Sequence, residues 1–199
     1  MPSESDVMIE TPPIRPYHHG NLRRVILDAA LDEIGERGPL DLSMRELARR
    51  AGVSHAAPAH HFGDKTGLLT AIATEGNELL GDALRLARET GGFLEVGLAY
   101  IQFAVDHPAH FDVMFRPHLL RSDDPELVAA RAVTTALLYG PASHEFPDDD
   151  ALRIGIAGWA FVHGFASLWL SGNLQHRLGD DPIAAAGAVA PTLFAPPRA

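Results

Sequence analysis

The chain of 199 residues contains no cysteine. This absence excludes disulfide frameworks, thiolate nucleophiles and zinc–thiolate sites, and it agrees with a reducing compartment. No uninterrupted apolar run approaches the ~20 residues that a helix needs to cross a bilayer. Residues 1–16 lack a basic start followed by an apolar core, so they do not match a signal peptide, and their prolines favour a flexible tail. We therefore expect a cytoplasmic protein without membrane contact.

Basic side chains are scarce. The chain carries 16 Lys and Arg against 26 Asp and Glu, a net charge of −10. The negative charge is unevenly distributed. Residues 1–70 hold 8 basic and 10 acidic side chains, whereas residues 71–199 hold 8 basic and 16 acidic side chains. A protein with this net charge is a poor bulk ligand for nucleic acid, so any DNA contact has to come from a local patch.

Strand-type alternation, internal repeats and a glycine-rich phosphate loop are all missing from the sequence. Apolar residues instead recur at helical spacing. In the first predicted helix Ile26, Ala30 and Ile34 follow Leu22, and Gly38-Pro39 ends it. Further helices are predicted over residues 44–51, 68–87, 93–107, 109–115, 125–139, 151–170 and 182–194. The predicted fold class is all-α.

One stretch combines several helix-end signals in close succession. Ser43 and Glu46 match a capping box, in which each side chain hydrogen-bonds the other residue's backbone amide. Gly52 supplies a left-handed turn residue. Ser54 is the predicted N-cap of a short third helix, with Pro58 in or just beyond its first turn, where a missing amide costs least. This order of helix, glycine-containing turn and short helix is the pattern of a helix-turn-helix.

The second helix of a helix-turn-helix lies in the DNA major groove. Small residues suit the places where the duplex comes close, and a few hydrogen-bonding side chains reach base edges. The candidate DNA-contacting residues of the third predicted helix are Ser54, His55, Ala56, Ala57, His60 and His61. An ordinary helical corner in an all-α protein is the alternative, and the pattern alone leaves both open.

Two adjoining stretches carry a family resemblance: GNLRRVILDAALDEIGERG over residues 20–38 and LDLSMRELARRAGVSHAAPAHHFGDKTGLL over residues 40–69. They closely resemble the DNA-binding head of the tetracycline-repressor (TetR) family of bacterial transcription regulators. Two later stretches resemble the family more weakly. AYIQFAVDHPAHFDVMF is similar to ligand-domain helices that meet at a proline, and WAFVHGFASLW is similar to the Trp…His-Gly (WHG) type of C-terminal domain.

The resemblance implies an all-α homodimer with a DNA-binding head at residues 17–66 and an effector-binding and dimerisation domain at residues 67–199. The implied function is a DNA-binding transcriptional regulator of the repressor kind, which a small-molecule effector releases from a double-stranded operator. Two-fold symmetry would make that operator near-palindromic. No cofactor, catalytic residue or metal is expected.

The family pattern also implies roles for individual residues of the head. Ser43, Arg45 and Lys65 would contact phosphates, and the recognition positions would be His55, Ala56, Ala57 and His60. One position departs from the pattern. Ala59 stands where the family usually has a tyrosine that hydrogen-bonds a phosphate, which puts one backbone contact in doubt.

The C-terminal part offers candidates for an apolar effector pocket and for a dimer contact. The pocket candidates are Phe103, Phe111, Met114, Phe115, Trp159 and His163, although the same residues would also suit a core. The predicted helix over residues 151–170 is apolar on all sides and needs packing partners on all sides. We expect Phe165 and Leu168 to face outward into a dimer interface, the alternative being burial within one subunit.

Two other functions stay open at the level of sequence. His107 and His110 with Asp106 or Asp112 have a spacing that a metal site would need, which makes a metal-dependent hydrolase the weaker rival. His163 is better read as a hydrogen-bonded core histidine than as a general base, because no nucleophile is marked for it. A helix-turn-helix retained only for protein contacts is the third reading.

Overall fold

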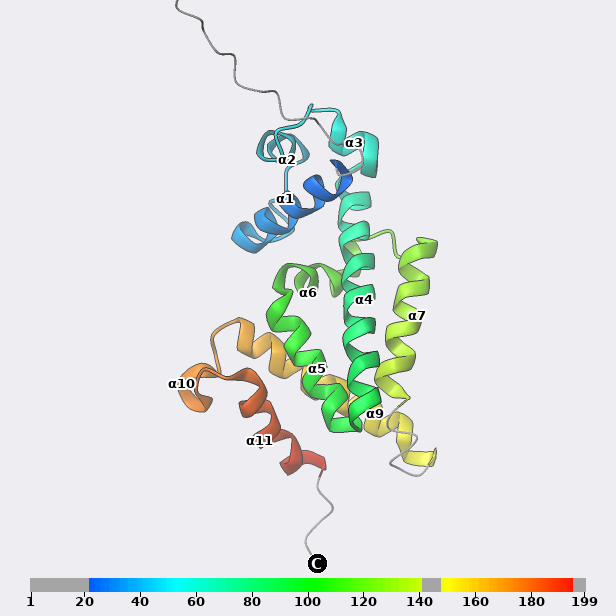
Figure 1. Cartoon of the computed structure of the whole chain (residues 1–199), viewed down its shortest axis with the longest axis vertical. Coiled ribbons are helices and arrows are strands. Elements are labelled where there is room, and N and C mark those ends of the chain that lie inside the picture. Colours follow the sequence, from blue (N-terminus) through cyan, green and yellow to red (C-terminus); the bar gives the residue numbers. More distant parts are fainter. Residues whose placement is uncertain (1–21, 141–147, 195–199) are drawn as a thin grey trace, which may run out of the picture.

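The computed structural model describes residues 22–140 and 148–194, and every element within these ranges is helical (Figure 1). The all-α prediction is confirmed, while the predicted tail at residues 1–16 lies outside the described residues. The elements are α1 (Leu22–Arg37), α2 (Met44–Arg50), α3 (Ala57–Phe62), α4 (Lys65–Thr90), α5 (Phe93–Asp106), α6 (Pro108–Met114), η1 (Pro117–Leu119), α7 (Pro125–Tyr139), α9 (Asp148–Leu170), α10 (Gln175–Leu178) and α11 (Pro182–Phe194).

Helices α1, α2 and α3 gather at one end of the molecule around the start of α4 (Figure 1). Each buries one face, and the inward residues are Ile26, Ala30 and Ile34 on α1, Leu47 and Ala48 on α2, and Ala57, Pro58 and Phe62 on α3. Gly52 adopts φ 64° in the turn after α2, a left-handed conformation that glycine takes without steric cost. The turn therefore lets α3 pack beside α2 while its other face stays on the surface.

Helix α4 begins in the head and continues through the C-terminal domain as one element (Figure 1). Asp64 caps its first turn by accepting a hydrogen bond from the backbone N–H of Gly67 at 2.8 Å. Helices α5, α6 and α7 pack along the rest of α4. The domain division predicted between residues 66 and 67 falls inside this helix, so α4 physically joins the two predicted domains.

The C-terminal helices begin and end where their prolines and caps predict. Pro108 follows the end of α5, and Asp124 caps α7 by accepting hydrogen bonds from the next two free backbone amides. Helix α9 packs against α5, α7 and α11. Its residues 150–170 are long and apolar enough to cross a membrane by length and composition, as the core helices of soluble proteins often are.

Candidate DNA-binding surface, domain junction and cavities

The outward face of the head is formed by α3 and the turn before it. Ser54, His55, Ala56 and His60 are exposed there, and His61 is half-buried. The small side chains leave the α3 backbone accessible to a duplex, and the histidine rings offer nitrogens that donate or accept hydrogen bonds. This face has the shape and chemistry needed to enter a major groove.

Two sequence-based expectations for this segment are wrong. Helix α3 begins at Ala57, and the Ser54 side chain does not cap it. Ser54 belongs to the preceding turn, where its carbonyl accepts a hydrogen bond from Ala57 N at 3.0 Å. Ala57 is only 8% exposed and packs into the core, so its side chain is not available to DNA. Pro58 does occupy the first turn, as predicted.

Cationic side chains near α3 differ in how many ion pairs and hydrogen bonds they form within the protein. Arg45 is exposed at the start of α2 and forms no ion pair with the part of the chain that the structure describes. Lys65, at the start of α4, donates from Nζ to the Leu40 carbonyl at 2.6 Å, which leaves its other protons free. These two residues therefore remain the candidate phosphate contacts on either side of α3.

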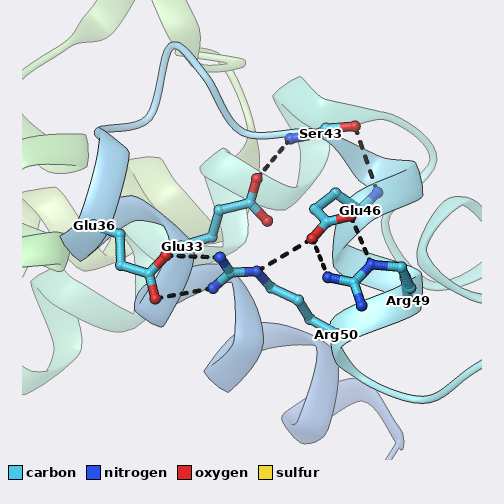
Figure 2. Close-up of polar contacts among 6 residues, drawn as sticks. All are labelled: Glu33, Glu36, Ser43, Glu46, Arg49 and Arg50. Atoms are coloured by element: carbon cyan, nitrogen blue, oxygen red, sulfur yellow. Dashed lines mark hydrogen bonds and ion pairs between the residues drawn. The ribbon is translucent and has the colours of Figure 1, made fainter.

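Arg49 and Arg50 form ion pairs with carboxylates of the head (Figure 2). Arg49 donates to Glu46 at 2.8 Å, and Arg50 donates to Glu36 at 2.7 Å. The Arg49 hydrogen bonds lower the pKa of Glu46 to about 2. Because their charge is matched locally, these arginines add little to the field that DNA would meet.

The cap of α2 differs from the predicted capping box. Ser43 Oγ accepts from Glu46 N at 3.5 Å, as expected, but the Glu46 carboxylate turns toward the arginines (Figure 2). The Ser43 backbone N–H instead donates to Glu33 Oε1 at 3.3 Å. Glu33 comes from α1 and is fully buried. The second half of the cap is thus a tertiary contact, which ties α1 to the start of α2.

A polar junction links the head to the C-terminal domain. The Glu75 carboxylate on α4 accepts two hydrogen bonds from Arg24 Nη1 on α1, at 2.7 and 2.8 Å. It also lies 3.3 Å from Nε2 of the buried His110 on α6. Burial lowers the pKa of His110, and the neighbouring Glu75 opposes that shift. Three helices therefore meet at one carboxylate, so a shift of α6 alters the environment of a side chain bound to the head.

Two adjoining cavities of the C-terminal domain reach predicted pocket residues. One, of about 310 Å³, is lined by Asn77, Leu80, Met114, Phe115, Pro117, Arg131, Thr134, Thr135, Leu138, Tyr139 and Trp159. The other, of about 260 Å³, is lined by Phe93, Leu94, Val96, Gly97, Leu98, Ile101, Leu138, Gly158, Trp159, Phe161, Val162, Ala190 and Pro191. Of the predicted pocket residues, Met114, Phe115 and Trp159 reach these cavities, whereas Phe103, Phe111 and His163 line neither.

The remaining pocket candidates belong to an aromatic cluster beside the cavities. Phe103 and Phe111 are buried, at 3% and 6% exposure. His163 Nδ1 lies 2.9 Å from the hydroxyl of Tyr100, a residue that sequence reasoning missed. Burial lowers the pKa of His163 and raises that of Tyr100, so the neutral pair is favoured. The interpretation of His163 as a hydrogen-bonded core histidine is confirmed.

Helix α9 presents a continuous outer face. Phe165 is only 6% exposed and packs within its own subunit, so the expectation that it points outward is wrong. Leu168 is 48% exposed. The exposed or half-exposed face of α9 consists of Leu152, Arg153, Ile156, Ala157, Ala160, Gly164, Ser167 and Leu168. Small and apolar side chains dominate this face, which suits close packing against another helix.

No group of three or more metal-ligating side chains occurs within residues 22–140 and 148–194. The rings of His107 and His110 lie 5.7 Å apart, centre to centre, and His110 is engaged with Glu75. His110, one of the two histidines that suggested a metal site, therefore belongs to the polar junction between the head and the C-terminal domain.

Comparison with known proteins agrees with this architecture. Residues 26–72 match the family of bacterial regulatory proteins called tetR, and residues 93–190 match the tetracyclin repressor-like C-terminal domain. The chain belongs to the TetR family. It is 31% identical to the HTH-type transcriptional regulator BetI of Rhizobium meliloti (strain 1021), over 85% of each chain.

Solved structures of similar proteins share the fold of this chain. A protein of unknown function from Rhodococcus sp. RHA1 is 34% identical, with a TM-score of 0.74 over 90% of this chain and 96% of the other. A tetR-family regulatory protein, also from Rhodococcus RHA1, shares the fold at 20% identity, with a TM-score of 0.66 over 84% and 92%. As a TetR-family member the chain is a DNA-binding transcriptional regulator and not an enzyme, so the hydrolase alternative is wrong.

The departure at Ala59 leads to a first prediction. Ala59 is exposed on α3, so Ala59→Tyr has room for a larger side chain, whose hydroxyl we expect to reach a phosphate as the family pattern implies. We expect operator binding to tighten by about fivefold, the value of one net hydrogen bond of about 1 kcal/mol, with base preference unchanged because backbone contacts position rather than specify. Fluorescence anisotropy on operator variants measures both quantities. His60→Ala is the contrasting variant, expected to alter preference at one or two base pairs, and weaker binding by Ala59→Tyr would contradict the docking geometry.

The buried histidines lead to a second prediction. Because burial lowers the pKa of both His110 and His163, the unfolded chain binds more protons than the folded protein just below the ordinary histidine pKa of about 6.5. The free energy of unfolding should therefore fall as the pH drops from about 7.5 to 5.5. Urea titrations across this range measure the slope, which His163→Gln should reduce. A free energy of unfolding that rises on acidification would show that these histidines gain, rather than resist, protons on folding.

Proposed function

We propose that this TetR-family regulator works as a cytoplasmic homodimeric repressor that a small molecule releases from a near-palindromic operator. The observation that carries the proposal is the continuity of α4, which starts beside the DNA-facing residues of the head and runs along one cavity, with Asn77 and Leu80 in its wall. A ligand at that cavity contacts the same helix that fixes the position of α3.

Contacts of the head support the DNA-binding part of the proposal. Arg45 and Lys65 lie on neighbouring helix starts, where backbone N–H groups add to their attraction for phosphate. His55 and His60 are exposed, and they are the proposed base-contacting residues. The chain's net charge of −10 makes these local contacts decisive, so affinity should fall steeply with salt.

The outer face of α9 supports the homodimer. Its small and apolar residues are exposed or half-exposed in the described part of the chain, and an isologous contact would pair this face with itself. Two heads related by a two-fold axis read two half-sites in opposite directions, about one helical turn or more apart.

Selection of genomic fragments by the purified protein tests the proposal. We expect enrichment of one near-palindromic sequence, bound with a stoichiometry of at least two chains per site. Arg45→Gln and Lys65→Gln should each weaken binding to every sequence about equally and lower the salt dependence. Asp82→Asn, an exposed acidic residue on α4 outside the head, is the control.

The competing possibility, a helix-turn-helix that contacts only proteins, predicts a different outcome. In that case the selection would enrich no sequence, although the dimer would form normally. Retention of dimers together with a loss of sequence-specific DNA binding would favour this alternative.

A further inference from the structure

The two cavities that Trp159 lines abut, since Leu138 also lines both of them. Each volume, about 260 and 310 Å³, is near the lower end of the range of about 300–1,000 Å³ that ligand pockets span. A ligand that occupied both would pass the Trp159 side chain. The two compartments differ sharply in chemistry, which constrains what such a ligand is.

The cavity between α5, α9 and α11 is a hydrocarbon compartment. Apart from the Trp159 indole, its lining consists of aliphatic side chains, phenyl rings, glycine and proline. None of these lining side chains carries a charge, and the Trp159 indole N–H is the one polar side-chain group among them. An alkyl chain buried here gains free energy in proportion to its apolar area, whereas a polar group would lose its water without replacement.

The cavity between α4, α6 and α7 carries unused hydrogen-bond donors. Arg131, Thr135 and Leu138 lie at positions i, i+4 and i+7, on one face of α7. Arg131 and Tyr139 are half-buried and Thr135 is exposed, and none of these three side chains forms a hydrogen bond or ion pair with the described residues. By contrast, Thr134 donates to the carbonyls of Asn77 and Ala130 and is already satisfied.

The residues that line the two cavities offer these donors no negatively charged acceptor. No aspartate or glutamate is among the residues that line either cavity. Trp159 Nε1 adds a buried donor that approaches the Tyr100 hydroxyl but has no partner in hydrogen-bonding geometry among the described residues. Arginine binds carboxylates through two parallel N–H bonds, which makes a carboxylate the natural ligand group here.

We propose that the effector is an amphipathic carboxylate, whose anionic group binds Arg131 and whose alkyl chain extends past Trp159 into the apolar cavity. The inference rests on the proposed function, because it specifies the ligand of the same regulatory site. A quaternary ammonium ligand is the main competitor, since Phe115, Tyr139 and Trp159 offer aromatic faces to a cation. Arg131 would repel that cation, and the walls supply no carboxylate to offset the repulsion.

Isothermal titration of the full chain without DNA tests the ligand class. The probes are decanoate, decanol and decyltrimethylammonium, which share an alkyl chain and differ in head-group charge. We expect decanoate to bind at least about tenfold more tightly than decanol, and the cation to bind most weakly. Arg131→Gln should remove the preference for decanoate and leave decanol binding unchanged. Arg85→Gln, which removes an exposed α4 arginine paired with Asp82 outside both cavities, is the matched control.

The alkyl compartment needs its own variant. Leu94 is 38% exposed in the wall of the apolar cavity, so Leu94→Trp can fill that cavity without entering the core. We expect it to weaken decanoate by about tenfold or more and to leave butyrate, which is too short to reach that compartment, unaffected. Circular dichroism and operator binding confirm that each variant folds.

Equal affinity for the three probes, tighter binding of the cation, or no effect of Arg131→Gln would overturn the inference. Because ligand binding is measured without DNA, the ligand class and the release from the operator are tested separately. Decanoate that binds through Arg131 but fails to release the operator would contradict the proposed effector mechanism alone. Operator binding with no carboxylate preference would contradict the ligand class alone.

Discussion

Replacing Ala160 with glutamate is expected to split the proposed dimer into monomers and to weaken operator binding at the same time. Ala160 lies on the exposed face of α9, one helical turn from Ile156 and from Gly164. If this face packs against its symmetry mate, each subunit would bury an unpaired carboxylate. That cost is on the order of 3 kcal/mol or more, which corresponds to at least about a hundredfold in the dimer dissociation constant.

The matched comparison uses two exposed aliphatic residues. Leu168 on α9 and Val128 on α7 are 48% and 49% exposed, so the environment of each side chain in one subunit is alike. Leu168→Glu should weaken the dimer, whereas Val128→Glu should leave it intact. Sedimentation velocity gives the oligomeric state and anisotropy gives the operator affinity. An Ala160→Glu monomer that bound the full operator as tightly as the unaltered protein would rule out the α9 dimer.

Most helix boundaries were predictable because local signals determine them, although the cap of α3 was wrongly predicted at Ser54 and α10 had no predicted helix. Pro108 cannot continue α5, and Asp124 with Pro125 satisfies the free amides at the start of α7. The head was predictable for the same reason, since the turn at Gly52 depends on one residue's backbone freedom. Where a distant residue competes with a local one, the prediction failed. The α2 cap is completed by Glu33 of α1 rather than by Glu46, which arginines of the same helix attract.

The candidate site was predictable only in part, because hydrophobicity does not distinguish a core from a cavity wall. Phe111 and Phe115 are equally apolar, but Phe111 is buried and only Phe115 reaches a cavity. Phe165 was expected to face outward for the same reason. Arg131 was missed because its place on one face of α7 acquires meaning only when the fold brings Phe115 and Trp159, from other parts of the chain, into the same cavity lining.

Side chains of α6 lie so close to Gly76 of α4 that this residue is sensitive to an added methyl group. A Cβ at Gly76 would lie 2.6 Å from Met114 Sδ and 3.1 Å from His110 Cβ. Gly76→Ala should therefore lower the free energy of unfolding by about 1–3 kcal/mol, because overpacking outweighs the gain in helix propensity. Gly81→Ala is the control on the same helix. Its Cβ would meet Val133 at 3.8 Å, an ordinary contact, so we expect a gain of about 0.5–1 kcal/mol.

The same substitution should also weaken operator binding in the absence of any effector. Pushing α6 away from α4 moves His110 relative to Glu75, the carboxylate that holds Arg24 of the head. Met114→Ala removes the atom nearest to the new methyl group, so the double variant should regain part of both the stability and the affinity, and a double-mutant cycle measures that coupling. Additive losses in the cycle would mean that the α4–α6 contact and the head respond independently, and that the junction does not connect them.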